Sequence, residues 1–224
     1  MCGRFALYAP ASDLAEVFGV DVLPELVARY NIAPTNQVLG IRAFSGGRTG
    51  DLYRWGLVPH WSRDARGAAR MINARSEKAA KAPAFRDAMR FRRLLVPASG
   101  FYEWRKEGGE RLPTFFCRED GGPVAFAGLW ERWRGPDGEM HSCTILTTDA
   151  NDLVRPVHHR MPVILPKEAW ARWLDPEIRD PAEVQSLLAP YPHEDLEAVP
   201  VSKRVNSVKN EGPELVEPVS GGSR

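Results

Sequence analysis

The chain has 224 residues, a net charge of +1 and three cysteines. This length can bury a core in one or two domains without a disulfide or a metal. Cys2, Cys117 and Cys143 are far apart and form no CxxC pair, which argues against a zinc site or disulfide framework and fits a reducing compartment. Because there is no basic start followed by an apolar run, and no apolar stretch of about 18 residues, we expect a soluble, cytoplasmic protein without membrane contact.

Charge is unevenly distributed along the chain. Residues 42–93 carry 13 Lys and Arg against 4 Asp and Glu, whereas residues 175–197 carry 7 acidic residues against 1 basic residue. Such a chain can present a basic face to a polyanion while its net charge stays near zero. An ordinary surface, on which the charges mix in three dimensions, explains these numbers equally well.

Turn residues and apolar periodicity divide the first half of the chain into short elements. Gly19 and Pro83 mark two helix ends, and Pro97 with Gly100 predicts a bend in a strand-like run. A hairpin turn is expected at Ser45-Gly46-Gly47. The predicted elements are strands at 3–9, 38–44, 51–58 and 94–104, and helices at 12–18, 73–81 and 85–90.

The second half of the chain continues in short elements. They are strands at 114–118, 124–132, 142–148 and 161–165, helices at 151–156, 166–174 and 180–188, and an extended segment at 199–206. Helices that do not alternate regularly with strands favour an α+β fold over a doubly wound sheet. We expect one domain over 1–217 and a disordered tail at 218–224.

The first residues offer unusual chemistry. Cys2 follows the initiator methionine and is small enough for Met1 to be trimmed, which would leave an amine and a thiol on one residue. Their reference pKa values are about 7.7–8.0 and about 8.5, so both groups gain nucleophilic character near neutral pH. Such a 1,2-aminothiol converts an aldehyde into a Schiff base and then into a thiazolidine. A buried strand cysteine is the ordinary alternative.

Two further stretches hold candidate acid–base groups. Glu103 lies between a tyrosine and a tryptophan, where it either faces solvent or is desolvated with a raised pKa that suits a general acid. His158 and His159 precede Arg160, and on extended backbone their side chains would point in opposite directions. One histidine can then move protons and Arg160 can grip a phosphate, although structural roles stay open. Without a carboxylate or cysteine at ligand spacing, no metal is expected.

Several residues are candidates for contacting nucleic acid. Asn73 stands where a helix is predicted to begin, so its ordinary role would be an N-cap, and Arg75 follows it. Ser207 and Lys209 supply a hydroxyl and an ammonium of the kind that bind backbone phosphates. The aromatic candidates for stacking on bases are Trp55, Trp61, Phe101 and Trp104, of which most should belong to the core.

In combination, the motifs resemble the SRAP family, the SOS response-associated peptidases or abasic-site processing proteins. The resemblance extends from residue 2 to about residue 216, and its specificity comes from the number and order of the motifs. They are MCGRF at 1–5, YNIAP at 30–34, WGLVP at 55–59, NARSE at 73–77, PASGFYEW at 97–104, HHRMP at 158–162 and VNSVKN at 205–210.

The resemblance implies a single α+β domain with a β-barrel-like, mixed and mostly antiparallel core, peripheral short helices and a basic groove for single-stranded DNA. It implies a monomer without a cofactor. Cys2 matches the crosslinking residue, Asn73 the residue that positions the sugar, Glu103 the proton-transfer group and His158 the group that opens the sugar ring. We choose His158 over His159 because the family's histidine stands two residues before its arginine. The expected DNA contacts are Arg4, Trp61, Arg75, Arg160, Ser207 and Lys209.

The implied reaction is a covalent thiazolidine crosslink between Cys2 and the ring-opened aldehyde of an abasic site, which shields the lesion. A Schiff base also permits weak strand cleavage by β-elimination. The peptidase name would cover release of Met1, whether by the chain itself or by an aminopeptidase.

Two other functions remain open. N-terminal-nucleophile amidohydrolases also start Met-Cys-Gly, and in them Cys2 would form a thioester with its own amine as base. A non-catalytic reader of modified DNA bases would use the same basic face without the cysteine chemistry.

Overall fold

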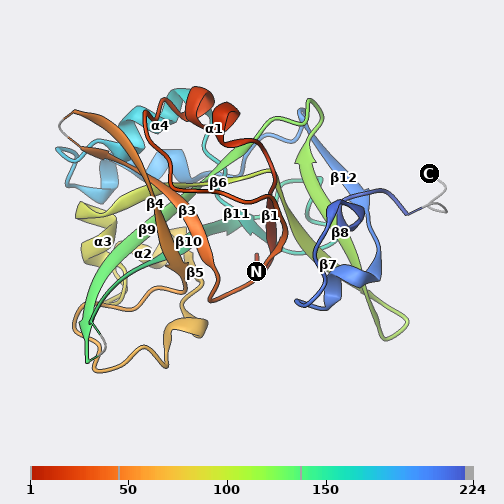
Figure 1. Ribbon diagram of the computed structural model, residues 1–224, viewed down its shortest axis with the longest axis horizontal. Coiled ribbons are helices and arrows are strands. Elements are labelled where there is room, and N and C mark those ends of the chain that lie inside the picture. Colours follow the sequence, from red (N-terminus) through yellow and green to blue (C-terminus); the bar gives the residue numbers. More distant parts are fainter. Residues whose placement is uncertain (1, 45, 137, 220–224) are drawn as a thin grey trace.

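The computed structural model describes residues 2–44, 46–136 and 138–219. They form two sheets that stand side by side, and β1 (Phe5–Leu7), which belongs to the five-stranded sheet, lies near the middle of the molecule (Figure 1). Among these residues, strand pairing is antiparallel except where β10 (Gly138–Asp149) pairs with β4 (Gly47–Trp55) and β5 (Asn73–Arg75). The expected α+β fold with a mixed, mostly antiparallel core is confirmed.

Five strands close into a barrel. β10 pairs with β4, β4 with β3 (Gln37–Phe44), β3 with β6 (Arg93–Ala98), β6 with β9 (Val124–Gly135), and β9 pairs again with β10. Closure gives each of these five strands a paired neighbour on both sides over part of its length. β10 also carries the short strands β5 and β11 (Arg160–Pro162), so that distant parts of the sequence meet along one strand. The barrel-like core is therefore confirmed.

The second sheet has the order β12–β8–β7–β1–β2. Its further strands are β2 (Arg29–Ile32), β7 (Gly100–Glu107), β8 (Glu110–Arg118) and β12 (Leu196–Pro200). β6 and β7 are separated only by Ser99, whose hydroxyl accepts hydrogen bonds from the backbone N–H groups of Tyr8 and Ala9. This break, predicted from Pro97 and Gly100, sends the chain from the barrel into the second sheet.

The helices are short and peripheral, as expected. α1 (Ala11–Phe18) and α4 (Lys167–Leu174) lie together above the barrel in Figure 1, joined by the stacked rings of Phe18 and Trp170 at 4.5 Å. The others are α2 (Ser76–Ala79), α3 (Arg86–Phe91) and the 3-10 helices η1 (Ala68–Arg70), η2 (Pro181–Leu188), η3 (Lys203–Asn206) and η4 (Pro213–Leu215). Gly19 ends α1 as predicted, in a left-handed conformation, but α1 begins at Ala11 after Pro10, without a side-chain cap. At the start of η2, the Asp180 side chain accepts a hydrogen bond from the N–H of Ala182.

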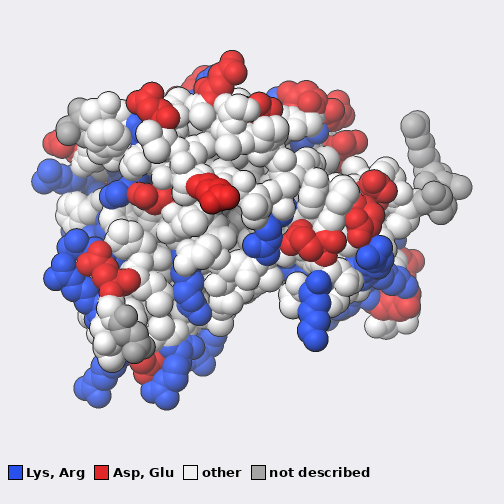
Figure 2. All heavy atoms as spheres, viewed as in Figure 1, with Lys and Arg blue, Asp and Glu red and all other residues white. Residues whose placement is uncertain are grey.

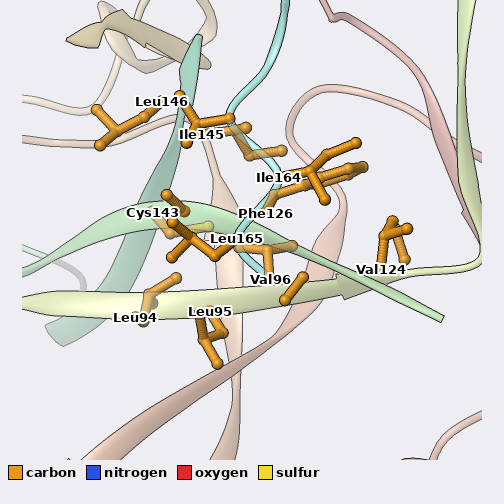
Figure 3. Packing of buried hydrophobic residues seen from close by; sticks show 14 of the residues in the cluster. Leu94, Leu95, Val96, Val124, Phe126, Cys143, Ile145, Leu146, Ile164 and Leu165 are labelled. Atoms are coloured by element: carbon orange, nitrogen blue, oxygen red, sulfur yellow. The ribbon is translucent and has the colours of Figure 1, made fainter. Parts of the chain in front are cut away.

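The main core fills the barrel. Figure 3 shows Leu94 and Val96 of β6, Phe126 of β9 and Ile145 of β10 within this cluster, and all four side chains are fully buried. β6 is buried along its whole length, which explains why its sequence is a continuous apolar run after Arg93 instead of an alternating one.

Some predicted elements differ in the structure. The predicted helix at 73–81 is wrong at its start, because residues 73–75 form β5 and pair with β10 before α2 begins. The segment 199–206 is extended only as far as Ser202, and residues 203–206 form η3. Within the predicted tail, the N–H of Val219 donates to the carbonyl of Pro200, whereas 220–224, like Ser45 of the predicted hairpin turn, lie outside the described residues.

Candidate functional site

The pairing of β1 with β7 brings the first residues to the predicted acid. Phe5 lies opposite Phe101, and the N–H of Tyr102 donates to the carbonyl of Arg4 at 3.0 Å. Continued by two residues, this antiparallel register places Gly3 opposite Glu103. Cys2 and Glu103 are thus neighbours because two strands far apart in sequence pair at this point.

Asn73 reaches the same place from the barrel. β5 lies beside β10 with Asn73 opposite Ile145, and the Asn73 side-chain amide donates a 2.7 Å hydrogen bond to the carbonyl of Cys2. The N-cap alternative for Asn73 is wrong, since Arg75 occupies the cap position of α2. Asn73 instead holds the backbone of the candidate nucleophile.

Glu103 and His158 form the acid–base part of the site. His158 Nδ1 lies 4.0 Å from Glu103 Oε1, and both side chains are mostly withdrawn from water. Burial raises the pKa of the Glu103 carboxyl and lowers the pKa of the His158 imidazole. Glu103 therefore keeps its proton to higher pH than a surface glutamate, and His158 favours the neutral form.

The two histidines do not point in opposite directions, as extended backbone had suggested. Residues 152–157 form turns, and β11 begins only at Arg160. The His158 and His159 rings are stacked with centroids 4.5 Å apart, but His159 is exposed while His158 is partly buried. His158 Nδ1 lies 3.0 Å from both the carbonyl oxygen and the N–H of Arg160; in the neutral tautomer with the hydrogen on Nδ1, the ring donates to that carbonyl and Nε2 is the proton acceptor.

The thiol of Cys2 is fully buried. Burial, with the nearby Glu103 carboxylate as a second cause, raises the pKa of this thiol far above its ordinary value. The thiol is consequently neutral at physiological pH. For the sulfur to take part in a reaction, the amine of the same residue must react first or the burial of the thiol must change.

A pocket of about 480 Å³ opens beside these residues. Its lining residues are Gly3, Arg4, Glu103, Trp104, Lys106, Arg111, His158 and Asn206. Three full positive charges thus surround one carboxyl group and one imidazole, which suits an anionic substrate that undergoes proton transfer. Among the described residues, no group of three or more His, Cys, Asp or Glu side chains is arranged to hold a metal ion.

The sequence and the fold of the chain are similar to those of known proteins. Residues 1–208 match the family described as "SOS response associated peptidase (SRAP)". The chain belongs to the SRAP family.

Over 223 residues it is 43% identical to the abasic site processing protein YoqW of Bacillus subtilis (strain 168), covering 97% of this chain and 99% of that protein. It is 32% identical over 227 residues to the abasic site processing protein YedK of Escherichia coli (strain K12), covering 98% and 100%. A crystal structure of a Bacteroides thetaiotaomicron protein superposes with a TM-score of 0.86 at 29% identity, covering 98% and 100%.

Arg160, which the SRAP resemblance marks as a DNA contact, is buried beneath the site. Its guanidinium makes a bidentate ion pair with Glu77, contacts Asp149 at 2.7 Å and donates to the carbonyl of Thr147 at 2.6 Å. The Arg160 hydrogen bond holds the pKa of Glu77 below its usual range. In this arrangement Arg160 anchors the segment that carries His158. The positive charge of Arg160 is already matched by the carboxylates of Glu77 and Asp149.

Arg4 is likewise committed to protein partners. One guanidinium nitrogen donates to Asn31 Oδ1 at 2.6 Å and to the carbonyl of Val205 at 2.8 Å, and the group lies 5.7 Å from the ring centre of Trp104. Sequence reasoning missed Asn31, although it belongs to the YNIAP motif. The amide of this buried residue also donates to the carbonyls of Ser207 and Asn210.

The other predicted DNA contacts lie on the surface. Trp61 is 59% exposed, and Arg75, Ser207 and Lys209 are exposed as well. Of the four aromatic stacking candidates, Trp55 and Phe101 are buried in the core, as was expected for most of them, and do not stack on bases. Figure 2 shows Lys and Arg side chains gathered along the lower part of one face, where the surface is notched beneath β1.

Proposed function

We propose that this chain processes abasic sites in single-stranded DNA by crosslinking itself to the lesion through Cys2 once Met1 is removed. The observation that carries the proposal is the arrangement of Asn73, Glu103 and His158 around Cys2 at a cationic pocket. The SRAP relatives named as abasic site processing proteins support the choice of substrate. The covalent link would shield the lesion from other enzymes.

The burial of the thiol supports an order of steps. The α-amine of the trimmed Cys2 adds to the C1′ aldehyde of the opened sugar, and loss of water gives a Schiff base. The sulfur then adds to the same carbon, the thiol proton passes to nitrogen, and a thiazolidine forms. Because both nucleophiles belong to one residue, the second step is intramolecular and has a high effective concentration.

Each neighbouring side chain has a role in this reaction. Glu103, with its raised pKa, can donate a proton to the departing water. Neutral His158 can take the hydroxyl proton of the closed sugar and so promote ring opening. Asn73 fixes the Cys2 carbonyl, and with it the direction in which the amine points.

The remaining features fit a single strand of DNA. Trp61, Arg75, Ser207 and Lys209 would contact the strand from the surface, with Arg4 and Arg160 supporting the pocket from within. Weak strand cleavage by β-elimination from the Schiff base, and release of Met1 by the chain itself, remain secondary activities of the proposal. We expect a monomer that needs no cofactor.

The decisive experiment incubates the purified chain with a single-stranded oligonucleotide that carries one abasic site. We expect an adduct that survives SDS and heat, with peptide mapping locating the DNA on Cys2. Cys2→Ala, and an N-terminal tag that blocks Met1 removal, should both abolish it. An adduct on another residue, or on a chain that still carries Met1, would overturn the proposal.

Two other results would favour the alternative functions. Glutamine hydrolysis without any adduct would favour an N-terminal-nucleophile amidohydrolase. Binding of intact modified DNA that is unaffected by Cys2→Ala would favour a non-catalytic reader of modified bases.

A further inference from the structure

The hairpin of β7 and β8 contains two like-charge pairs in direct register. Glu107 lies opposite Glu110, and Lys106 lies opposite Arg111. Like charges directly opposite each other destabilise an antiparallel pair. The repulsion within such a pair can be offset by an opposite charge, either from the protein or from a bound ligand.

The acidic pair has its counter-charges within the protein. Glu107 contacts Arg105 at 2.7 Å, and Glu110 contacts Lys203 at 2.5 Å. Both cations line a separate, largely apolar pocket that includes Leu112. Nothing further is required to explain this part of the hairpin.

The basic pair is different. Within the ranges that the structure describes, neither Lys106 nor Arg111 makes a side-chain hydrogen bond or an ion pair, and both are exposed. Both line the 480 Å³ pocket that contains Glu103 and His158. Two opposed cations without a carboxylate partner thus stand at the entrance to the candidate reaction centre.

The wall behind this pair is fixed by Asn206. Its side-chain oxygen accepts a 2.6 Å hydrogen bond from the indole N–H of Trp104, and its amide donates to the carbonyl of Arg111 at 3.4 Å. The end of η3 is therefore tied across the hairpin by Asn206. A preformed cationic pocket binds anions with little reorganisation cost.

We propose that Lys106 and Arg111 form a phosphate subsite that binds the DNA phosphodiester next to the abasic sugar. This inference rests on the proposed function, and it names the residues that set the position of the strand. A phosphate between the two side chains supplies the missing counter-charge. It also places the neighbouring sugar beside Glu103, His158 and Gly3, which line the same pocket. The pair binds and positions substrate, and takes no part in proton transfer.

The test compares the double variant K106A/R111A with R105A/K203A. The control loses the same two charges near the same hairpin, but from side chains that are paired with acids and line the other pocket. Single-turnover adduct formation is measured against DNA concentration at several salt concentrations. We expect K106A/R111A to raise the half-saturating DNA concentration about tenfold, far more than it changes the maximal rate, and to lower the salt slope by about 0.7 per lost phosphate contact. The control should resemble the wild type.

A second measurement locates the phosphate. Neutral methylphosphonate linkages are placed one at a time on either side of the abasic site. One linkage should weaken binding by the wild type and by R105A/K203A but have no further effect on K106A/R111A. If no linkage behaves in this way, or if K106A/R111A matches the control in affinity and salt slope, the subsite is refuted.

The two proposals can fail separately. If the wild type forms no adduct at any DNA concentration, the crosslinking function fails. The phosphate subsite can still be tested by equilibrium binding of the same oligonucleotides, measured by fluorescence anisotropy in the Cys2→Ala background. K106A/R111A is again compared with R105A/K203A.

Discussion

The guanidinium of Arg4 and the side-chain oxygen of Asn31 are joined by a 2.6 Å hydrogen bond. This contact links β1, which follows the candidate nucleophile, to the C-terminal segment, because Asn31 also donates to the carbonyls of Ser207 and Asn210. Residues from three distant motifs are thereby fixed as one wall of the site. Arg4 acts within this network as an organiser of the pocket.

Asn31→Leu is expected to lower the free energy of unfolding by roughly 3 kcal/mol, because it leaves buried carbonyls and the Arg4 guanidinium without a partner. Thermal or urea unfolding measures the loss. Gln185→Leu, at an exposed amide, is the control and should change stability little. Equal stability of the two variants would contradict the role given to Asn31.

Asn73→Ala is expected to slow adduct formation by about 10- to 100-fold, as misplacement of a reacting group does, while the fold is retained. The variant loses the hydrogen bond from the Asn73 amide to the Cys2 carbonyl but leaves β5 paired with β10 through its backbone. Quench-flow or gel kinetics at saturating DNA give the rate, and circular dichroism checks the fold. Wild-type kinetics in Asn73→Ala would show that the Cys2 backbone needs no such support.

Local elements followed from the sequence because their causes are local. Gly19 could be read as a helix end and Pro97 with Gly100 as a strand break, since each restricts its own backbone. The strand character of residues 73–75 could not be read in this way, because it depends on pairing with β10, about 70 residues away. Tertiary contacts override helix propensity at such positions.

The candidate site likewise contains residues that could be predicted from local motifs and contacts that depend on the fold. The motif residues Cys2, Glu103 and His158 were recognisable in the sequence, and burial of the carboxyl among aromatic residues had been foreseen as one of two outcomes. The partners of Arg160 were not foreseen, because its ion pair with Glu77 joins residues 83 positions apart. An arginine in a motif looks the same whether it binds phosphate or carboxylate. Only the arrangement of nearby acids decides between these uses.

His158→Ala should slow adduct formation substantially, by about 100-fold or more for a lost proton-transfer group, whereas His159→Ala should have little effect. The reason is that His158 lies 4.0 Å from Glu103 and lines the pocket, while the exposed His159 ring stacks on it from outside. Pre-opened aldehyde substrates provide a control, because a defect in ring opening should largely disappear with them. The reverse order of severity in the two variants would assign the role to His159.

Arg160→Lys is expected to lower the free energy of unfolding by roughly 2 to 3 kcal/mol, because an ammonium cannot reproduce the bidentate contact with Glu77 and the bond to Thr147. The salt dependence of DNA binding should change little, since the lysine keeps the charge and the site is buried. Differential scanning calorimetry and salt-dependent anisotropy measure the two effects. Full stability together with a reduced salt slope would instead indicate a direct phosphate contact.

Glu103→Gln is expected to slow crosslinking and also to change how the stability of the fold depends on pH. Burial raises the pKa of Glu103 in the folded state, so the wild type keeps its full stability below the ordinary glutamate pKa of about 4.3 and loses stability as pH rises through the folded-state value. The glutamine variant does not undergo this loss. We therefore expect its melting temperature to match the wild type near pH 4 and to exceed it increasingly toward neutral pH, while its crosslinking rate falls about 100-fold. Glu16→Gln on the exposed face of α1 should show neither effect. A melting-temperature difference that is constant with pH would mean that Glu103 is ionised at ordinary pH and is no general acid.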